Sequence, residues 1–330
     1  MHKKIKISVI IPSAPDRSFE AILQNLEKIK PPHVEMEIFI IKGTWPPLQR
    51  NMGIKAATGD YIFFFDDDII IPAGSIEAAL ATFEENPEIQ VVGGPNITPL
   101  ESSFIQQCIG QAHASFFTGL QTSIRYRKSR APKTVNENHL ITCNLAFRTK
   151  ILKENLFNPA LFANEENELL GRLVRKGNLL AYNPDFFIYH HRRKNIAQYA
   201  KQIFKWGEGR TLHTIKRPAH FKPTFFIPLL FLGYCISLIW LHPTETNSTV
   251  YYLPLVTYLI LALIFSTITC MREKNSHRRP RWSYLLVLPW LFFVTHISYA
   301  FGLLWGFFTI FKELHLPEEK DFLLIKIELV

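Results

Sequence analysis

Two spacings of hydrophobic residues alternate along the first 100 positions of the chain. Short runs of β-branched and aromatic residues, the pattern of buried strands, occupy residues 7–11, 35–43, 61–65 and 89–94. Apolar positions at the three- and four-residue intervals of a helix occupy residues 19–29, 49–58 and 73–86. Ser75 is the expected N-cap of the third helix. This rhythm predicts an α/β fold with a mostly parallel sheet and helices on both faces.

The periodicity weakens between residues 102 and 133, and we expect an insertion there that shapes an acceptor site. A strand and the start of a helix follow over residues 139–152. After them come an acidic turn, a helix with its leucines on one face, and a strand that ends in His190 and His191. The soluble domain is therefore predicted to end near residue 191.

Three stretches nearly free of charge follow, at residues 224–241, 250–270 and 283–311. Each is close to or above the roughly 20 residues that span a bilayer, so about three membrane segments are predicted. No apolar segment opens the chain, so no signal peptide is expected and the N-terminal domain should stay in the cytoplasm. The loops agree, because residues 190–222 and 271–281 are strongly basic whereas residues 242–249 contain no Lys or Arg. If all three segments cross, the C-terminus lies outside.

Composition and charge narrow the expected partners. Hydrophobic residues make up 48% of the 330 residues, and the formal net charge is +9. The basic residues gather beside the membrane segments and form no recognisable nucleic-acid module, so anionic membrane lipid is expected as a partner and nucleic acid is not. The cysteines lack CxxC spacing, which indicates neither a zinc site nor a disulfide framework.

Three aspartates, Asp66 to Asp68, stand directly after the apolar run of residues 61–65. Adjacent carboxylates are costly to bury unless a cation neutralises them, and taken alone they fit a solvated turn equally well. The carboxyl end of a central strand is, however, where open α/β sheets bind ligands. Asp66 and Asp68 point to the same side of an extended chain and together suit Mg or Mn, which would serve a phosphate. No GxGxxG or P-loop supplies another phosphate cradle.

From Lys6 to about Arg210 the chain resembles the family 2 glycosyltransferases of the GT-A fold. The matching segments, in the family's order, are ISVIIP, QRNMGIKAATGDYIFFFDDD, TCNLAFR, NEENELLGRLVRKG and YNPDFFIYHH. The resemblance implies that Asp66 and Asp68 hold a divalent metal on a nucleotide-sugar diphosphate. It also implies that Glu166, the second acid of NEEN, is the catalytic base, although the family carries Asp there. Glu165 is the alternative base.

The same resemblance implies further site residues. Four are expected to bind the donor, namely Pro12, Arg50, Asp67 and Asn144. A surface arginine at the start of a helix is the alternative for Arg50. His190 is expected to complete the metal shell, with a structural histidine as the alternative. Glu168 is expected to face solvent on the first helical turn, where an acid suits the helix dipole.

Two motifs depart from the family. The second strand ends in Lys42 and Gly43, where the family has aspartates that read the nucleotide base. The base specificity of the family is therefore not expected to apply to this chain. The QxxRW motif of processive synthases reads QIFKW here, with Gln202, Lys205 and Trp206, and Lys does not replace a bidentate Arg. Three spans also favour transfer of a single sugar. Residues 195–210 instead predict a basic amphipathic helix at headgroup level, and they resemble exopolysaccharide-type glucosyltransferases that act on polyprenyl-diphosphate-linked acceptors.

These features predict a cytoplasmic GT-A domain over residues 1–191, a basic interfacial segment over 192–223, a membrane region of about three spans over 224–311 and a C-terminal tail over 312–330. The expected reaction is inverting, metal-dependent transfer of one sugar from a nucleotide-sugar to a lipid-linked saccharide acceptor. We expect it at the cytoplasmic face of the plasma or inner membrane, in cell-surface polysaccharide biosynthesis. Three alternatives stay open: a polyprenyl-phosphate sugar synthase, a processive polysaccharide synthase and a catalytically silent membrane scaffold.

Overall fold

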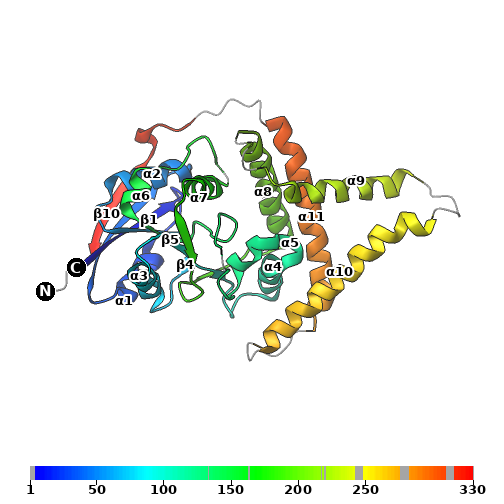
Figure 1. The fold of residues 1–330 in the computed structure, drawn as a ribbon, viewed down its shortest axis with the longest axis horizontal. Helices are drawn as coiled ribbons and strands as arrows, with labels where there is room; N and C mark the ends of the chain where they lie inside the picture. Colours follow the sequence, from blue (N-terminus) through cyan, green and yellow to red (C-terminus); the bar gives the residue numbers. More distant parts are fainter. Residues whose placement is uncertain are drawn as a thin grey trace. The chain divides into compact units, whose positions relative to one another are not determined.

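The computed structural model describes residues 4–132, 134–162, 164–216, 218, 221–241, 248–275, 282–309 and 316–329 (Figure 1). The chain forms two compact units. The first comprises Met1–Pro99, Ile124–His191 and Glu313–Val330, and the second comprises Leu100–Ser123 and Arg192–Lys312. Each unit has a hydrophobic core of its own.

A seven-stranded sheet forms the centre of the first unit. In chain order its strands are β1 (Ile5–Ser13), β2 (Val34–Lys42), β3 (Tyr61–Phe65), β5 (Ile89–Gly93), β7 (Asn144–Arg148), β8 (Leu179–Tyr182) and β10 (Leu323–Leu329). Their order in the sheet is β10-β2-β1-β3-β7-β5-β8. β7 is antiparallel to β3 and β5, and β10 is antiparallel to β2, whereas the other pairs are parallel. The predicted mostly parallel sheet is therefore confirmed.

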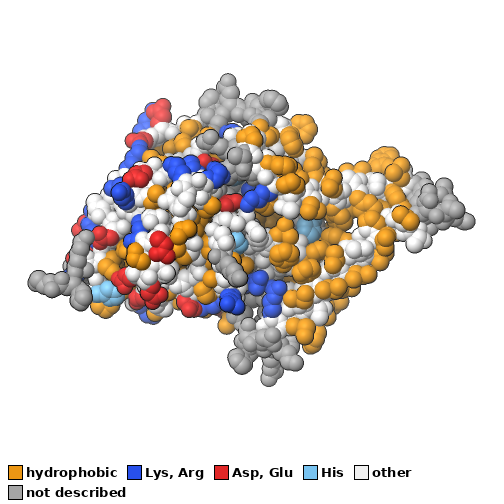
Figure 2. All heavy atoms as spheres, in the orientation of Figure 1, with side chains coloured by type: hydrophobic (Ala, Val, Ile, Leu, Met, Phe, Trp, Pro, Cys, Tyr) orange, Lys and Arg blue, Asp and Glu red, His pale blue; other side chains and the backbone are white. Residues whose placement is uncertain are grey.

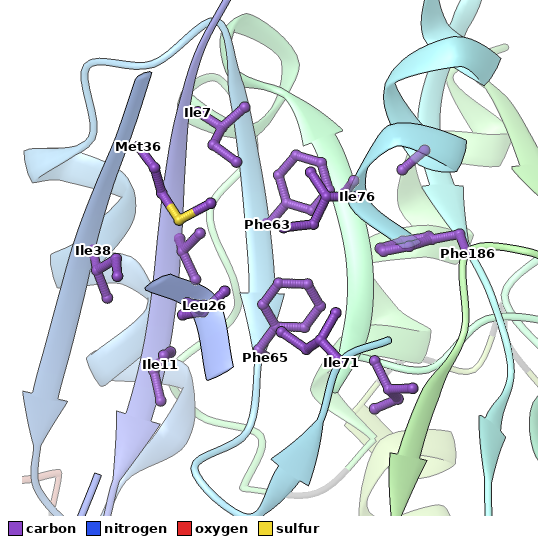
Figure 3. Packing of buried hydrophobic residues seen from close by; sticks show 14 of the residues in the cluster. Ile7, Ile11, Leu26, Met36, Ile38, Phe63, Phe65, Ile71, Ile76 and Phe186 are labelled. Atoms are coloured by element: carbon purple, nitrogen blue, oxygen red, sulfur yellow. The ribbon is translucent and has the colours of Figure 1, made fainter. Parts of the chain in front are cut away.

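The central strands bury side chains on both faces, which explains why they are apolar at nearly every position. Because successive side chains point to opposite faces, Phe63 and Phe65 enter one core cluster and Ile62 and Phe64 enter the other. Figure 3 shows the first cluster, in which Phe63 and Phe65 lie beside Phe186. This packing on both sides fixes β3, and with it the position of the residues that follow.

Helices cover both faces of this sheet (Figure 1). α1 (Glu20–Ile29) and α3 (Ser75–Glu85) contribute to the first cluster, and α2 (Pro46–Ala56), α6 (Thr149–Lys153) and α7 (Glu165–Arg175) contribute to the second. The prediction that Ser75 caps α3 was wrong. Gly74, at φ 82°, takes the cap position, and the Ser75 hydroxyl donates to Phe187 O instead.

A small three-stranded sheet accompanies the large one and consists of β4 (Ile69–Ile70), β9 (Ile188–His190) and β6 (Asn96–Ile97), in that order. β9 is antiparallel to β4 and parallel to β6. Through β4, which begins one residue after the three aspartates, this sheet connects the end of β3 to the end of β9.

The second unit is helical. Its helices are α4 (Phe104–Ala114), α5 (Phe116–Gly119), α8 (Ile196–Lys216), α9 (Ile227–Trp240), α10 (Ser248–Asn275) and α11 (Tyr284–Thr309). Within the described residues, three helical segments are long and apolar enough to cross a membrane: Pro223–Trp240, Thr249–Arg272 and Tyr284–Thr309. They match the three predicted segments. Figure 2 shows the hydrophobic side chains gathered over α9, α10 and α11.

The elements that were not predicted include α4 and β10. α4 lies within the stretch of weak periodicity and begins with a capping box in which Ser103 and Gln106 exchange hydrogen bonds. β10 forms from the chain after α11 and pairs along the edge of β2, from Leu323 opposite Lys42 to Leu329 opposite Met36.

Candidate active site

Asp66, Asp67 and Asp68 follow β3 at a point where two other strands converge. Phe65, the last residue of β3, pairs with Asn144, the first residue of β7. Ile69 pairs with His190, the last residue of β9. The sheet pairing thus brings the aspartates, an asparagine and a histidine together from three distant parts of the sequence.

Arg17 and His190 neutralise part of the aspartate cluster. Arg17 Nη1 lies 2.6 Å from Asp67 Oδ1 and 2.9 Å from Asp68 Oδ2, and His190 Nε2 lies 3.2 Å from Asp68 Oδ1. Burial raises the pKa of Asp68, but the hydrogen bond and charge of His190, and then those of Arg17, outweigh burial and hold this pKa well below its usual range. The hydrogen bond from Arg17 to Asp67 raises the Arg17 pKa in turn.

Asp66 has a different environment. Its pKa is raised mainly by burial, against the opposing charges of His190 and Arg50. Asp66, Cys143 and His190 can each direct one ligand atom into a common space, since these atoms lie within 4.8 Å of one another. Among the described residues, Asp67 Oδ2 and His190 Nδ1 are buried without a hydrogen-bond partner. Oxygen and imidazole donors that lack partners beside a carboxyl group fit a divalent cation such as Mg or Mn.

Cys143 was not among the predicted site residues. Its Sγ accepts a hydrogen bond from Asn96 Nδ2 at 3.3 Å. Thiolate sulfur suits softer metals such as zinc, whereas Mg and Mn prefer oxygen and tolerate imidazole. We therefore expect Asp66 and His190, and not Cys143, to act as ligands of a hard cation.

Asn144 and Pro12 frame the same edge of the sheet. Asn144 is fully buried, and its Nδ2 donates to Phe186 O at 2.7 Å. Its Oδ1 has no hydrogen-bond partner among the described residues. Pro12 pairs with Ile41 near the end of β1 and is half-buried.

Lys42, which stands where the family reads the nucleotide base, is held by the loop after β1. Its Nζ donates to Ser13 Oγ at 3.2 Å, to Ala14 O at 3.1 Å, and also to Arg17 O. These contacts fix the loop that carries Arg17. Lys42 is therefore a positioning residue for Arg17.

Arg50 and Glu165 form a buried ion pair. Arg50 Nη1 on α2 lies 2.5 Å from Glu165 Oε1, at the start of α7, and the two residues are 6% and 7% exposed. Arg50 is thus not the surface arginine considered as an alternative. Burial, followed by the charge of Glu166, raises the pKa of Glu165 to about 7, although Arg50 opposes the shift. The charge of Arg50 also opposes the rise in the pKa of Asp66, so one guanidinium stabilises the charged form of both Asp66 and Glu165.

Glu166 is more accessible and less tightly held than Glu165. Arg125 Nη1 lies 3.8 Å from Glu166 Oε1, beyond hydrogen-bond distance, and Asn167 Nδ2 donates to the same oxygen at 3.4 Å. Arg125 is fixed by other groups, because it donates to Asn138 O at 2.8 Å and to Asn167 Oδ1 at 2.7 Å. A carboxylate near a fixed cation but without a tight ion pair is able to accept a proton from a bound hydroxyl.

The prediction that Glu168 faces solvent was wrong. Glu168 is 1% exposed, and Arg172, one helical turn later, pairs with both of its carboxylate oxygens at 3.2 Å. Arg172 also donates to Leu156 O at 2.7 Å. Glu168 therefore anchors α7 to the preceding loop.

Gln202, Lys205 and Trp206 lie on α8 in the second unit. Lys205 Nζ pairs with Glu208 at 2.7 Å, and the Trp206 ring lies 5.3 Å from that of His113. Lys205 thus forms an ion pair with a residue of its own helix, one turn later.

Arg17 and Arg125 are the cations that sequence reasoning missed. Each lies in a loop or short helical segment without periodicity, and each has one partner at least 40 residues away in sequence, Asp67 for Arg17 and Asn167 for Arg125. The only signal was indirect, because three adjacent acids require a cation when they are partly buried.

Comparisons with known proteins show which proteins this chain is similar to. Residues 3–156 match the family model described as Glycosyl transferase family 2. Two curated relatives, both named pre-mycofactocin glycosyltransferase and from Mycobacterium tuberculosis strains CDC 1551 / Oshkosh and H37Rv, are 23% identical over 182 residues. The match covers 54% of this chain but only 37% of the length of these relatives.

Two solved structures resemble the chain along most of its length. A mannosyltransferase from Pyrobaculum calidifontis in complex with GDP-Man and Mn2+ has a TM-score of 0.56 at 13% identity, and the match covers 92% of this chain and 88% of that one. TarS 1-349 of S. aureus in complex with UDP has a TM-score of 0.44 at 15% identity, with coverages of 91% and 90%. The first similarity shows a shared fold.

Proposed function

We propose that this chain is a glycosyltransferase whose catalytic domain belongs to family 2, and that it transfers one sugar, with inversion, from a nucleoside diphosphate sugar to a lipid-linked saccharide. One observation carries the proposal. The charge of the buried Arg50 opposes the rise in pKa of Asp66, in the aspartate cluster, and of Glu165, beside Glu166. The groups suited to the donor and to the acceptor therefore share one buried cation.

The donor end of the site is assigned to the aspartate cluster. Asp66 and His190 would hold a divalent cation, with Asp68, which contacts His190, beside them. Such a cation, when bound, supplies positive charge to the diphosphate of the donor. Arg17 places a further positive charge at this edge of the sheet. The similar fold of a mannosyltransferase in complex with GDP-Man and Mn2+ supports this class of donor and cofactor.

The acceptor end is assigned to Glu166. Its carboxylate takes the proton of the acceptor hydroxyl while the hydroxyl oxygen forms a bond to the anomeric carbon. The bond from that carbon to the diphosphate oxygen breaks, and its electron pair leaves with the nucleoside diphosphate. A single displacement of this kind inverts the anomeric centre.

The lipid-linked nature of the acceptor is inferred from the second unit. It offers three apolar helices of membrane-spanning length and the helix α8, which carries Lys201, Lys205 and Lys216 on its exposed positions. The basic flanks of these segments favour the cytoplasmic face for the catalytic domain.

A polyprenyl-phosphate sugar synthase is the nearest alternative. Its acceptor oxygen is already ionised and needs no base, so the two functions differ in their dependence on Glu166. The altered motif at Lys205, which pairs with Glu208, supports single transfer over processive synthesis.

The test is to incubate the purified full-length protein in lipid nanodiscs with a panel of nucleotide-sugars, Mn2+ or Mg2+, and extracted membrane lipids, and to look for a new glycolipid. The matched control is Asp66→Asn, which removes the charge but keeps the size of the side chain. We expect one donor to give a glycolipid with the native protein and none with the control. Hydrolysis of every donor without a lipid product, or equal products from both proteins, would contradict the proposal.

A further inference from the structure

The position of β10 limits how often the chain crosses a membrane. β10 pairs with β2 over seven residues, and Ile325 and Ile327 pack against the core of the catalytic sheet. Lys326 Nζ lies 3.3 Å from the buried Glu37 of β2. A strand cannot pair with a sheet across a bilayer, so the chain before α8 and the chain after α11 lie on the same side. The number of crossings is therefore even, and the three apolar helices cannot all cross.

α11 is bound closely to α8 (Figure 1). A Cβ at Gly302 would lie 2.0 Å from Phe204 O, and one at Gly207 would lie 2.3 Å from Tyr299 O, so the two backbones touch. Tyr199 Oη lies 2.6 Å from Thr295 Oγ1, and Thr211 Oγ1 donates to Leu303 O at 2.8 Å. These contacts run in the same direction along both helices for about 12 residues, or roughly 18 Å.

α8 is too highly charged to enter hydrocarbon. Lys201, Lys205 and Lys216 are exposed on it, and charged side chains are expensive at the centre of a bilayer. The part of α11 bound to α8 must therefore lie at the same depth as these lysines. A groove of about 590 Å³ between the two helices combines Lys201 with Phe301, Trp305 and Phe308. Charged and aromatic groups side by side are typical of the membrane interface.

α9 and α10 have the features of a membrane hairpin. The segment Pro223–Trp240 has 18 residues, or about 27 Å of helix against a hydrocarbon core of about 30 Å. Tyr234 Oη donates to Tyr251 O at 2.9 Å and Tyr251 Oη donates to Ser237 O at 2.5 Å, which ties the helices together near their connection. Trp240 and Tyr252 are exposed there, as expected for aromatic residues at a membrane boundary.

The charges of the two connections distinguish this hairpin from one made of α10 and α11. Residues 242–247 contain no Lys or Arg, whereas residues 276–281 contain three Arg. Loops rich in Lys and Arg remain on the cytoplasmic side of the membrane, where the chain is synthesised. The connection after α10 is therefore expected on the side of the catalytic sheet, which requires α9 and α10 to be the crossing pair.

We propose that α9 and α10 cross the membrane as a hairpin, and that α11 lies with α8 in the membrane interface on the same side as the catalytic sheet. The exposed apolar face of α11 is then a lipid-binding surface. This arrangement replaces the expectation of three crossings with an external C-terminus. It does not depend on the proposed reaction, because it rests on strand pairing, helix packing and loop charge.

Single cysteines at Thr246, Ser276 and Lys320 test the proposal in the full-length protein. A membrane-impermeant maleimide is applied to sealed vesicles and, separately, to opened ones, with the unsubstituted protein as the background for its native cysteines. We expect Thr246→Cys to be labelled from the side opposite to Ser276→Cys and Lys320→Cys, which share one side.

Two results would overturn the proposal. Labelling of Ser276→Cys and Lys320→Cys from opposite sides would show that α11 crosses. Labelling of all three positions from one side would show that the hairpin does not cross. Lys320 is exposed and, within the part of the chain that the structure describes, pairs with the exposed Glu318, so its substitution leaves the fold intact. Monodisperse elution in detergent verifies this for each variant.

Discussion

Replacing Glu166 with Gln separates catalysis from folding at the acceptor end of the site. The amide keeps the size of the side chain and can still accept the hydrogen bond from Asn167, but it cannot take a proton. Loss of a general base costs about 10²- to 10⁴-fold in turnover, or about 3–5 kcal/mol in the activation free energy. Donor affinity should survive, since the donor groups lie in the aspartate cluster.

The structure predicts that this loss does not come from unfolding. Arg125 lies 3.8 Å from Glu166 and keeps its hydrogen bonds to Asn138 O and Asn167 in the variant. Glu165→Gln is the matched control, because Glu165 holds Arg50 in a buried ion pair at 2.5 Å. Glu165→Gln should therefore lower the turnover less than Glu166→Gln.

The assay combines single-turnover kinetics with thermal unfolding of the same preparations. Glu166→Asp is the intermediate case, because it withdraws the carboxylate by about one C–C bond, and misplacement by about 1 Å can cost about 10²-fold. Full activity of Glu166→Gln would refute the hydroxyl-acceptor mechanism. It would point either to Glu165 as the base or to a phosphate acceptor that needs none.

Other consequences follow from the same contacts. Asp66→Ala and Asp68→Ala should abolish transfer and the divalent dependence of donor binding, measured by calorimetry, and donor binding that is unchanged by EDTA in the native protein would contradict the metal assignment. Burial, and then the charge of Glu166, raises the pKa of Glu165 from 4.5 to about 7, so the contribution of this residue to stability is fully present below pH 4.5 and is lost as the pH rises through 7. A comparison of native and Glu165→Gln unfolding across this range measures the loss, and parallel curves would refute it. Glu37 should show the opposite pH dependence. Burial raises its pKa, but hydrogen bonds from Ser8 and Thr58 outweigh burial and lower this pKa to about 2. The contribution of Glu37 to stability, measured by comparison with Glu37→Gln, should therefore vanish as the pH falls from 4.5 through 2. Cys143→Ser should leave Mn2+- or Mg2+-dependent transfer intact, whereas loss of metal dependence would identify the thiol as a ligand.

The catalytic sheet could be read from the sequence where strands are buried on both faces. The run from Tyr61 to Phe65 predicted β3, which the structure confirms. The acids after this run predicted that ligands bind at this edge of the sheet. β10 was missed, although Ile325, Lys326, Ile327 and Glu328 alternate as a half-buried strand should. What the sequence does not contain is its partner, because β2 lies nearly 300 residues earlier and only the fold brings them together.

In the candidate site too, local motifs could be predicted from the sequence, but contacts between distant residues could not. The acidic positions were visible as motifs, but their cations were not, since Arg17 and Arg125 reach their partners through tertiary structure. Glu168 shows an error of a different kind. Its partner Arg172 lies four residues later on the same helix, and this spacing predicts an ion pair, whereas the favourable helix dipole alone predicts only an acid in the first turn.

Transfer of one sugar with inversion to a lipid-linked acceptor is tested on the product itself. The most direct measurement takes the glycolipid formed by the purified protein from a single α-linked nucleotide-sugar, determines its mass, and reads its anomeric configuration by NMR. We expect an acceptor heavier by one sugar residue, linked in the β configuration, and absent when Glu166 is replaced by Gln. A ladder of products, or a single sugar with retained configuration, would contradict it.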